Sequence, residues 1–365
     1  MKPSLNWLLI SVPISVGLHF FVPDRATFIF VAACLGIIPL AGWLGKATEH
    51  LAEKTGDGIG GLLNATFGNA AELIIALVAL NRGLYGVVKA SLTGSIIGNL
   101  LLVMGGALLA GGMRFKTQKF NEAAARSQSS MLLLAAISLI VPAAFHYLAG
   151  SAAVPKEDGL SLEISVVLII TYGLSLVFSL GTHKKYFAGS VKSAEPTEPT
   201  EDTNHDVWPL RKSLGVLAGA TALIAWLSEI LVGSVEQAAH AFGMTSVFVG
   251  VIVVAIVGNA AEHSTAILTA MKNRMDLSLG VSIGSSIQIA LFVAPVLVFA
   301  SYFIGPRPMN LVFSPAEVMA IVVTVIITGQ VTGDGESNWL EGVQLLAVYI
   351  ILGIVFYFLP EAPQQ

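Results

Sequence analysis

Long apolar runs separated by short polar stretches dominate the pattern of this chain. Eleven runs can be drawn, each bounded by charged, Gly or Pro residues, and about 20 apolar residues are enough for a helix to cross a bilayer. The pattern therefore predicts an all-α integral membrane protein with eleven transmembrane helices. The runs lie at residues 7–22, 26–48, 59–80, 86–111, 127–149, 161–182, 212–236, 244–271, 277–304, 311–330 and 339–359.

The composition supports a membrane protein. Of 365 residues, 55% are hydrophobic and 12% are charged, whereas soluble domains carry about 25% charged residues. The mean hydropathy is +0.79. A net charge of −4 without a basic patch argues against nucleic acid, and the single cysteine, Cys34, excludes both a disulfide within the chain and a cysteine metal cluster. The bilayer is the expected surrounding, and an oligomer stays open.

The charged loops predict the orientation. The N-terminal segment has Lys2 and an apolar run to Val22 but no small-residue cleavage site, so we expect a retained first helix. With eleven spans and the N-terminus inside, 14 of the 19 Lys and Arg residues fall on cytoplasmic loops, as the positive-inside rule requires. Short loops favour a prokaryotic inner membrane, with a vacuolar membrane as the alternative.

The chain contains an internal repeat. The motif Gly-Asn-Ala-Ala-Glu at residues 68–72 recurs at 258–262, and six of nine positions match over 68–76 at this offset of 190. The same offset pairs Gly-Ser-Ile-Ile at 94–97 with Gly-Ser-Ser-Ile at 284–287. A weaker similarity, at another offset, links Thr48-Glu49-His50-Leu51 with Ser228-Glu229-Ile230-Leu231.

The repeat predicts the domain organisation. We expect an N-terminal transmembrane helix at 1–23, a first five-helix repeat at 24–182, a cytoplasmic acidic linker at 183–210 and a second five-helix repeat at 211–365. An odd number of helices per repeat makes the second copy enter from the opposite face. Inverted repeats of this kind suit alternating access, so the architecture favours a carrier.

Two glutamates are the expected centre of the site. Glu72 and Glu262 lie near the middle of their spans, and neither span contains a Lys or Arg. A charged group at a helix centre costs about 2.5–3.5 kcal/mol on insertion scales. A protonated glutamate bonded to a neighbouring helix is the alternative, but duplication in opposed helices favours a site. Two carboxylates carry a charge of −2, which matches one divalent cation.

Neighbouring polar groups extend this site. Asn69 precedes Glu72 by three residues, as Asn259 precedes Glu262, so each pair shares a helix face. Carboxylate and amide oxygens favour Ca²⁺ over soft metals. His263 points about 100° away from Glu262 around a helix, and we favour a packed neutral histidine over a metal ligand.

Several other polar residues have two readings each. Asn99 and Gln288 either line the ion path or bond to a neighbouring helix. Glu49, near the cytosol, and Glu229, near the outside, are candidates for proton entry or gating, with capping or interfacial solvation as the alternative. Glu317, in the predicted span 311–330, is a weaker candidate for proton entry or gating.

Small residues predict close helix crossings in two spans. They recur every four positions, and small side chains let the backbones of membrane helices approach each other. We therefore expect tight packing at Ala90, Gly94, Gly98, Gly280 and Gly284.

The repeated motif resembles the calcium/proton exchanger family of the calcium/cation antiporter superfamily. The resemblance rests on both Gly-Asn-Ala-Ala-Glu motifs, on the segments at 94–103 and 284–293, and on residues 334–342. It implies that Glu72 and Glu262 coordinate Ca²⁺ with Asn69 and Asn259 beside them, and that spans 2 and 7 slide as gates. Sodium/calcium exchangers carry a Thr-Ser-x-Pro type motif at this place, which favours proton coupling here.

These observations predict a calcium/proton antiporter that works by alternating access. Ca²⁺ is the transported substrate, and no cofactor is expected. Protons and Ca²⁺ compete for the same carboxylate oxygens, and this competition is enough to couple the two fluxes. The alternatives are an antiporter with Na⁺, K⁺ or Mn²⁺ in place of one ion, and, less favoured, a cation channel. The chain has no HExxH or GxGD motif and no likely nucleophile placed beside a base, so we do not expect an enzyme.

The linker between the repeats is acidic and interrupted by prolines. This composition predicts a flexible tether rather than a calcium-sensing helix. Its acidic residues are Glu195, Glu198, Glu201, Asp202 and Asp206.

Overall fold

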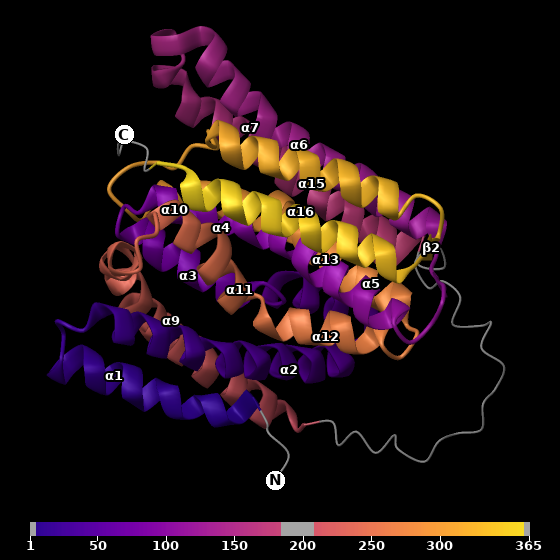
Figure 1. The fold of residues 1–365 in the computed structure, drawn as a ribbon, viewed down its shortest axis with the longest axis horizontal. Helices are drawn as coiled ribbons and strands as arrows, with labels where there is room; N and C mark the ends of the chain where they lie inside the picture. The colour runs from indigo at the N-terminus through magenta and orange to yellow at the C-terminus, as the bar shows by residue number, and fades with distance from the viewer. Residues whose placement is uncertain (1–4, 184–207, 361–365) are drawn as a thin grey trace.

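The computed structural model describes residues 5–183 and 208–360, and the acidic residues of the linker lie outside the described residues. The described chain is mostly helical (Figure 1). The elements before the linker are η1 Leu5–Ile10, α1 Ser11–Phe21, α2 Ala26–Phe67, α3 Ala70–Asn81, α4 Tyr85–Ile97, η2 Gly98–Val103, α5 Met104–Gly112, β1 Gln118–Lys119, α6 Glu122–Ala149, η3 Gly150–Ala152, η4 Val154–Lys156, α7 Glu157–Leu176 and η5 Val177–Thr182.

The second part of the chain repeats this order of long and interrupted helices. Its elements are α9 Leu210–Ala241, α10 Ser246–Phe248, η6 Val249–Val254, α11 Ala255–Gly258, α12 Ala260–Ala270, α13 Met275–Gln288, η7 Ile289–Val293, α14 Ala294–Ser301, α15 Pro315–Val331, β2 Glu336–Ser337 and α16 Trp339–Phe358. The two short strands pair antiparallel, with Gln118 opposite Ser337. This pairing joins the loop after α5 to the loop before α16.

The helices have the length and composition of a multi-pass membrane protein. Within residues 5–183 and 208–360, seven helical segments are long and apolar enough to cross a bilayer, or eight if the bent pair 246–258 and 260–270 is one span. Shorter apolar helices lie at Leu5–Phe21, Ala70–Asn81 and Pro315–Val331. The membrane assignment is therefore confirmed, and the count of eleven crossings stays a prediction.

Helix α2 departs from the predicted boundaries. It continues for 42 residues, through the polar stretch expected to separate two spans. The predicted boundary near residues 49–58 was wrong because this stretch contains Leu, Ala, Glu and Lys, which favour helix. At about 1.5 Å per residue, α2 is roughly twice as long as the 30 Å hydrocarbon core. The actual interruption comes later, at Gly68 and Asn69.

The sequence repeat is reproduced in the backbone. The turns that follow α3 and α12 both contain a residue with positive φ, Gly83 (75°) and Asn273 (59°), which are 190 positions apart. Two hydrogen bonds that close each turn match at the same offset. They run from Gly83 and Leu84 to the carbonyls of Leu80 and Ala79, and from Asn273 and Arg274 to those of Ala270 and Thr269.

The two turns lie at opposite ends of the molecule. Arg82 and Tyr85 stand where the 28-residue segment Tyr85–Gly112 begins. Just beyond its other end, Arg114 Nη1 donates to the carbonyl of Met271 after α12, at 3.1 Å. We call the end with Arg82 the Arg82 face and the end with Lys272 the Lys272 face. Helices α3 and α12 therefore point in opposite directions.

Helices α1, α2 and α9 pack against one another along one side of the molecule, at the lower edge of Figure 1. Helices α6, α7 and α15 lie on the opposite side. The interrupted helices α3–α5 and α10–α14 fill the space between these groups. The long pair α2 and α9 contains the predicted spans 2 and 7.

The expectation of tight crossings is confirmed in the first repeat only. A Cβ on Gly94 would clash with the backbone of Val251, and one on Gly250 would lie 2.7 Å from the Cβ of Ala90. The same prediction was wrong in the second repeat, and at the end of the first-repeat stripe, because a Cβ there would meet no atom of the described residues within 4 Å. These open positions are Gly98, Gly280 and Gly284.

Candidate functional site

Both copies of the repeated motif interrupt a helix. Asn69 (φ −102°, ψ 28°) and Asn259 (φ −92°, ψ 6°) leave the helical conformation, and the segments flanking Asn259 meet at 62°. Glu72 and Glu262 consequently lie in the first turns of α3 and α12. A helix start has unpaired N–H groups and a positive dipole end, which stabilise carboxylates at these positions.

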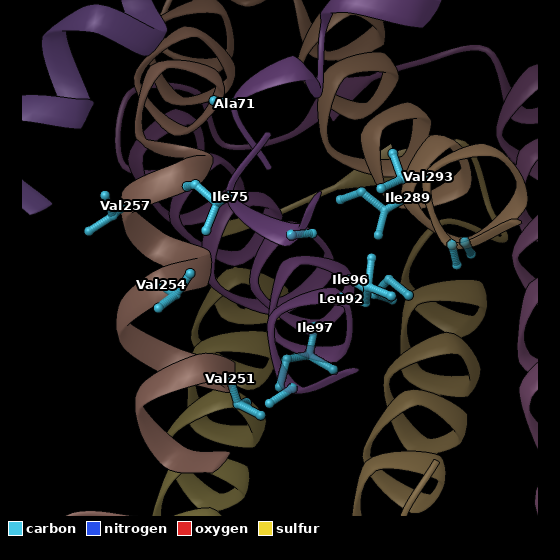
Figure 2. Close-up of a cluster of buried hydrophobic side chains, with 14 of the residues drawn as sticks. Ala71, Ile75, Leu92, Ile96, Ile97, Val251, Val254, Val257, Ile289 and Val293 are labelled. Carbon is cyan, nitrogen blue, oxygen red and sulfur yellow. The ribbon is translucent and has the colours of Figure 1, made fainter. Parts of the chain in front are cut away.

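Apolar packing holds the broken helices together. Figure 2 shows a cluster of buried apolar side chains from α3, α4, η6, α11 and η7, with Ala71 of the first motif among them. Ile75, Ile97 and Val251 are almost fully buried. Bulky side chains on short helices fix the distance between the motif helices, which positions the polar groups next to this cluster.

The two glutamates are brought together. The Glu72 side chain is buried and lies against Gly258, where an added Cβ would be 3.2 Å from its Oε1. Glu262, four residues after Gly258 in the second motif, is half-buried. Its Oε2 is buried without a hydrogen-bond partner among the described residues. An unpaired carboxylate oxygen beside a second carboxylate is suited to accept a cation.

Each motif asparagine is held by the opposite repeat. Asn69 Nδ2 donates to Gln288 Oε1 at 2.6 Å, and Asn69 Oδ1 accepts a bond of 2.6 Å from Ser285 Oγ. Asn259 Nδ2 donates to Ser95 Oγ at 3.0 Å, and Asn259 Oδ1 accepts from Asn99 Nδ2 at 3.2 Å. A carbonyl oxygen has two lone pairs, so each amide oxygen retains one for an ion.

The serines of this network were not among the predicted site residues. Ser95 and Ser285 are buried and 190 positions apart, and each contacts the asparagine of the other repeat. The sequence signal was present, because Gly-Ser is repeated at 94–95 and 284–285. A serine in an apolar span does not by itself indicate a site residue, because its hydrogen-bond partner on another helix is not known from the sequence.

A cavity of about 770 Å³ leads to this network. Its inner wall includes Glu262, Ser285 and Gln288, and its outer part includes the exposed Lys46 and Glu49 on α2. Asn121 and Asp276 also line it, so it opens on the Lys272 face. Glu72 does not line it among the described residues, which gives the two glutamates unequal access.

The remaining predicted residues are more scattered. Glu229 lies on the Arg82 face in an ion pair with Arg82 (2.6 Å). His263 is half-buried and lies outside the described lining of the cavity. Glu317 is buried and forms a capping box with Ser314 at the start of α15, which is a structural role.

Comparison with known proteins identifies the group of relatives. The profile of the sodium/calcium exchanger protein family matches residues 25–181 and 212–358. The chain is 47% identical over 368 residues to the Ca²⁺/H⁺ antiporter of Aphanothece halophytica, covering 98% of this chain and 97% of the relative. It is 45% identical to the Ca²⁺/H⁺ antiporter ChaA of Bacillus subtilis, covering 95% and 97%.

The fold has a similar solved counterpart. The structure of native YfkE superposes with a TM-score of 0.82 at 42% sequence identity. The match covers 98% of this chain and 100% of the YfkE chain. The similarity therefore extends over both halves of the chain.

Proposed function

The chain belongs to the sodium/calcium exchanger family, and we propose that it moves Ca²⁺ across a membrane in exchange for H⁺ by alternating access. Its relatives in Aphanothece halophytica and Bacillus subtilis are named Ca²⁺/H⁺ antiporters. Membership of an exchanger family makes the protein a transporter rather than an enzyme. The observation that carries the proposal is the pair Glu72 and Glu262 on two oppositely directed broken helices. Glu262 lines the cavity that opens on the Lys272 face.

The proposed membrane arrangement has eleven crossings, made by one N-terminal helix and two inverted five-helix repeats. The three shorter apolar helices and the bent pair supply the four crossings beyond the seven long segments. The N-terminus then faces the cytoplasm, and the cavity opens on the cytoplasmic side. The location is a prokaryotic inner membrane.

We assign the Ca²⁺ site to Glu72 and Glu262, with Asn69 and Asn259 supplying amide oxygens. Carboxylate and amide oxygens are the ligands that Ca²⁺ prefers. Glu262 offers an oxygen without a protein partner, while the serines hold the asparagines in place from the opposite repeat. In this scheme Gln288 lines the ion path and Asn99 positions Asn259.

Protons drive the cycle by competing for the same carboxylates. Ca²⁺ binding requires both glutamates without their protons, so loading one ion releases the other. An empty site with two charges is costly to enclose in a low-dielectric environment. The site therefore crosses the membrane either with Ca²⁺ or with protons, which couples the two fluxes.

The test is Ca²⁺ uptake into proteoliposomes across an imposed pH gradient. We expect uphill uptake that follows the gradient and is lost in both Glu72→Gln and Glu262→Gln. Glu163→Gln, an exposed glutamate on α7, is the matched control and should transport normally. Uptake that ignores pH but follows a Na⁺ gradient would overturn the proton assignment, and competition by Mn²⁺ or K⁺ measures selectivity. Passive flux without counter-transport would indicate a channel.

A further inference from the structure

An ion pair on the Arg82 face joins a core helix to a long outer helix. Arg82 Nε and Nη2 both donate to Glu229 Oε2 on α9, at 3.1 and 2.6 Å. Gly233, one turn further along α9, leaves room for the guanidinium, because a Cβ there would be 2.6 Å from Arg82 Nη1. Helices α3 and α9 also pack against each other. The surface of α9 therefore has space for the Arg82 guanidinium beside Glu229.

The same ion pair lies at the far end of the helix that begins at the site. Glu72 is in the first turn of α3, and Arg82 follows its last residue, Asn81. At about 1.5 Å per residue, ten residues of helix place the two about 15 Å apart. A helix this short moves as one piece, so a shift at Glu72 reaches the contact with Glu229.

The inverted repeat contains an equivalent set of residues on the Lys272 face. Lys272 lies 190 positions after Arg82, in the turn that has matching backbone hydrogen bonds. Glu49 lies 180 positions before Glu229, and the hydroxyls that precede the two carboxylates make the same bond. Thr48 Oγ1 donates to the carbonyl of Leu44 at 2.9 Å, and Ser228 Oγ donates to that of Ile224 at 2.7 Å.

This second pair is apart in the present structure. Glu49 is exposed beside the cavity mouth, and among the described residues neither Glu49 nor Lys272 forms an ion pair. Leu268, four residues before Lys272, lines the same cavity. The helices that carry them, α2 and α12, are in contact. The cavity is open where this pair would close it.

We propose that Arg82–Glu229 and Glu49–Lys272 are alternating latches, each formed in the state in which the other is broken. The proposal rests on the proposed alternating access. Helices α2 and α9 pack along each other, so the two glutamates move together relative to α3 and α12. A movement that brings Glu49 to Lys272 withdraws Glu229 from Arg82. The first pair closes the Arg82 face here, and the second closes the Lys272 face in the opposite state.

Cysteine cross-linking tests directly whether one ion pair forms only when the other is broken. In a Cys34→Ala background, Glu49→Cys and Lys272→Cys are joined by a short bifunctional thiol reagent. The rate of cross-linking measures how often the Lys272 face closes. Exposed ion pairs change an equilibrium by roughly two- to fivefold, so adding Glu229→Gln should raise this rate by about that factor.

Two further variants make the result specific. The exchange of charges in Arg82→Glu with Glu229→Arg should return the rate to its original value. Glu236→Gln, an exposed glutamate two turns further along α9, should leave it unchanged. No cross-link with or without Ca²⁺, or a rate that ignores Glu229→Gln, would overturn the latches. Because the readout is a cross-link, it stays informative even if the exchanged ions differ from Ca²⁺ and H⁺.

Discussion

Replacing Ser285 should impair Ca²⁺ binding more than replacing its repeat partner Ser95. Ser285 Oγ donates to Asn69 Oδ1 at 2.6 Å and accepts from Asn99 Nδ2 at 3.2 Å. Alanine at 285 leaves the Asn69 oxygen without that donor inside a buried network. Among the described residues, Ser95 Oγ takes part in one hydrogen bond, which it accepts from Asn259 Nδ2, and Asn259 Nδ2 also donates to the carbonyl of Ala255 at 2.9 Å.

The magnitudes follow from these partners. A buried polar group left without its partner costs about 1–3 kcal/mol, which is roughly a 5- to 150-fold change in an equilibrium constant. Ser285→Ala should therefore raise the Ca²⁺ concentration for half-maximal uptake by at least about fivefold. Ser95→Ala removes one of two acceptors and should change it by less than about fivefold.

The assay is concentration-dependent Ca²⁺ uptake into proteoliposomes at a fixed pH gradient. Ser282→Ala is the control, since this buried hydroxyl of the same helix bonds only to the carbonyl of Ser278 among the described residues, at 3.1 Å and within its own helix. Equal effects of Ser95→Ala and Ser285→Ala, or a larger effect at Ser95, would refute the reasoning from the unequal partners.

Three other measurements follow. Lowering the pH on the Ca²⁺-loading side should raise the Ca²⁺ concentration for half-maximal uptake, because protons occupy the site carboxylates. Uptake measured at several pH values tests this, and a half-maximal concentration independent of pH would contradict the competition. Gly94→Ala should destabilise the detergent-solubilised protein by about 1–3 kcal/mol against the backbone of Val251, whereas Gly284→Ala should be near neutral, as thermal unfolding would show. Asn338→Ala should cost about 1 kcal/mol by removing the capping box with Glu341, and an unchanged unfolding temperature would count against that role.

Much of the candidate site could be predicted from one repeated motif. Glu72 and Glu262 stood out because a carboxylate in an apolar span is costly, and the fold places Glu72 against Gly258 of the second motif. Ser95 and Ser285 were missed because a hydroxyl in a membrane helix can bond to its own backbone, so the sequence does not distinguish structural from site serines. The role of the four as ligands or supports of Ca²⁺ stays a prediction.

The local pattern also misjudged where helices break. The polar residues 49–58 predicted a loop, yet α2 continues through them and ends at Phe67. A helix can carry charged residues wherever it leaves the hydrocarbon, so polarity alone does not mark its end. Glycine followed by asparagine in each motif was the better signal, because these residues readily leave the helical conformation.

The sequence by itself determined the membrane environment, the internal repeat and the two carboxylates, because apolar length and buried charge are properties of residues along the chain. Only the tertiary structure decided that the cavity opens on the Lys272 face and that an ion pair joins Arg82 to Glu229 on the Arg82 face. The two repeats have nearly the same motifs, yet Gly94 is packed against Val251, while a Cβ on Gly284 would meet no atom of the described residues within 4 Å. Packing between helices that are distant in the sequence sets this asymmetry. A local pattern that both repeats share cannot encode on which face of the molecule the cavity opens.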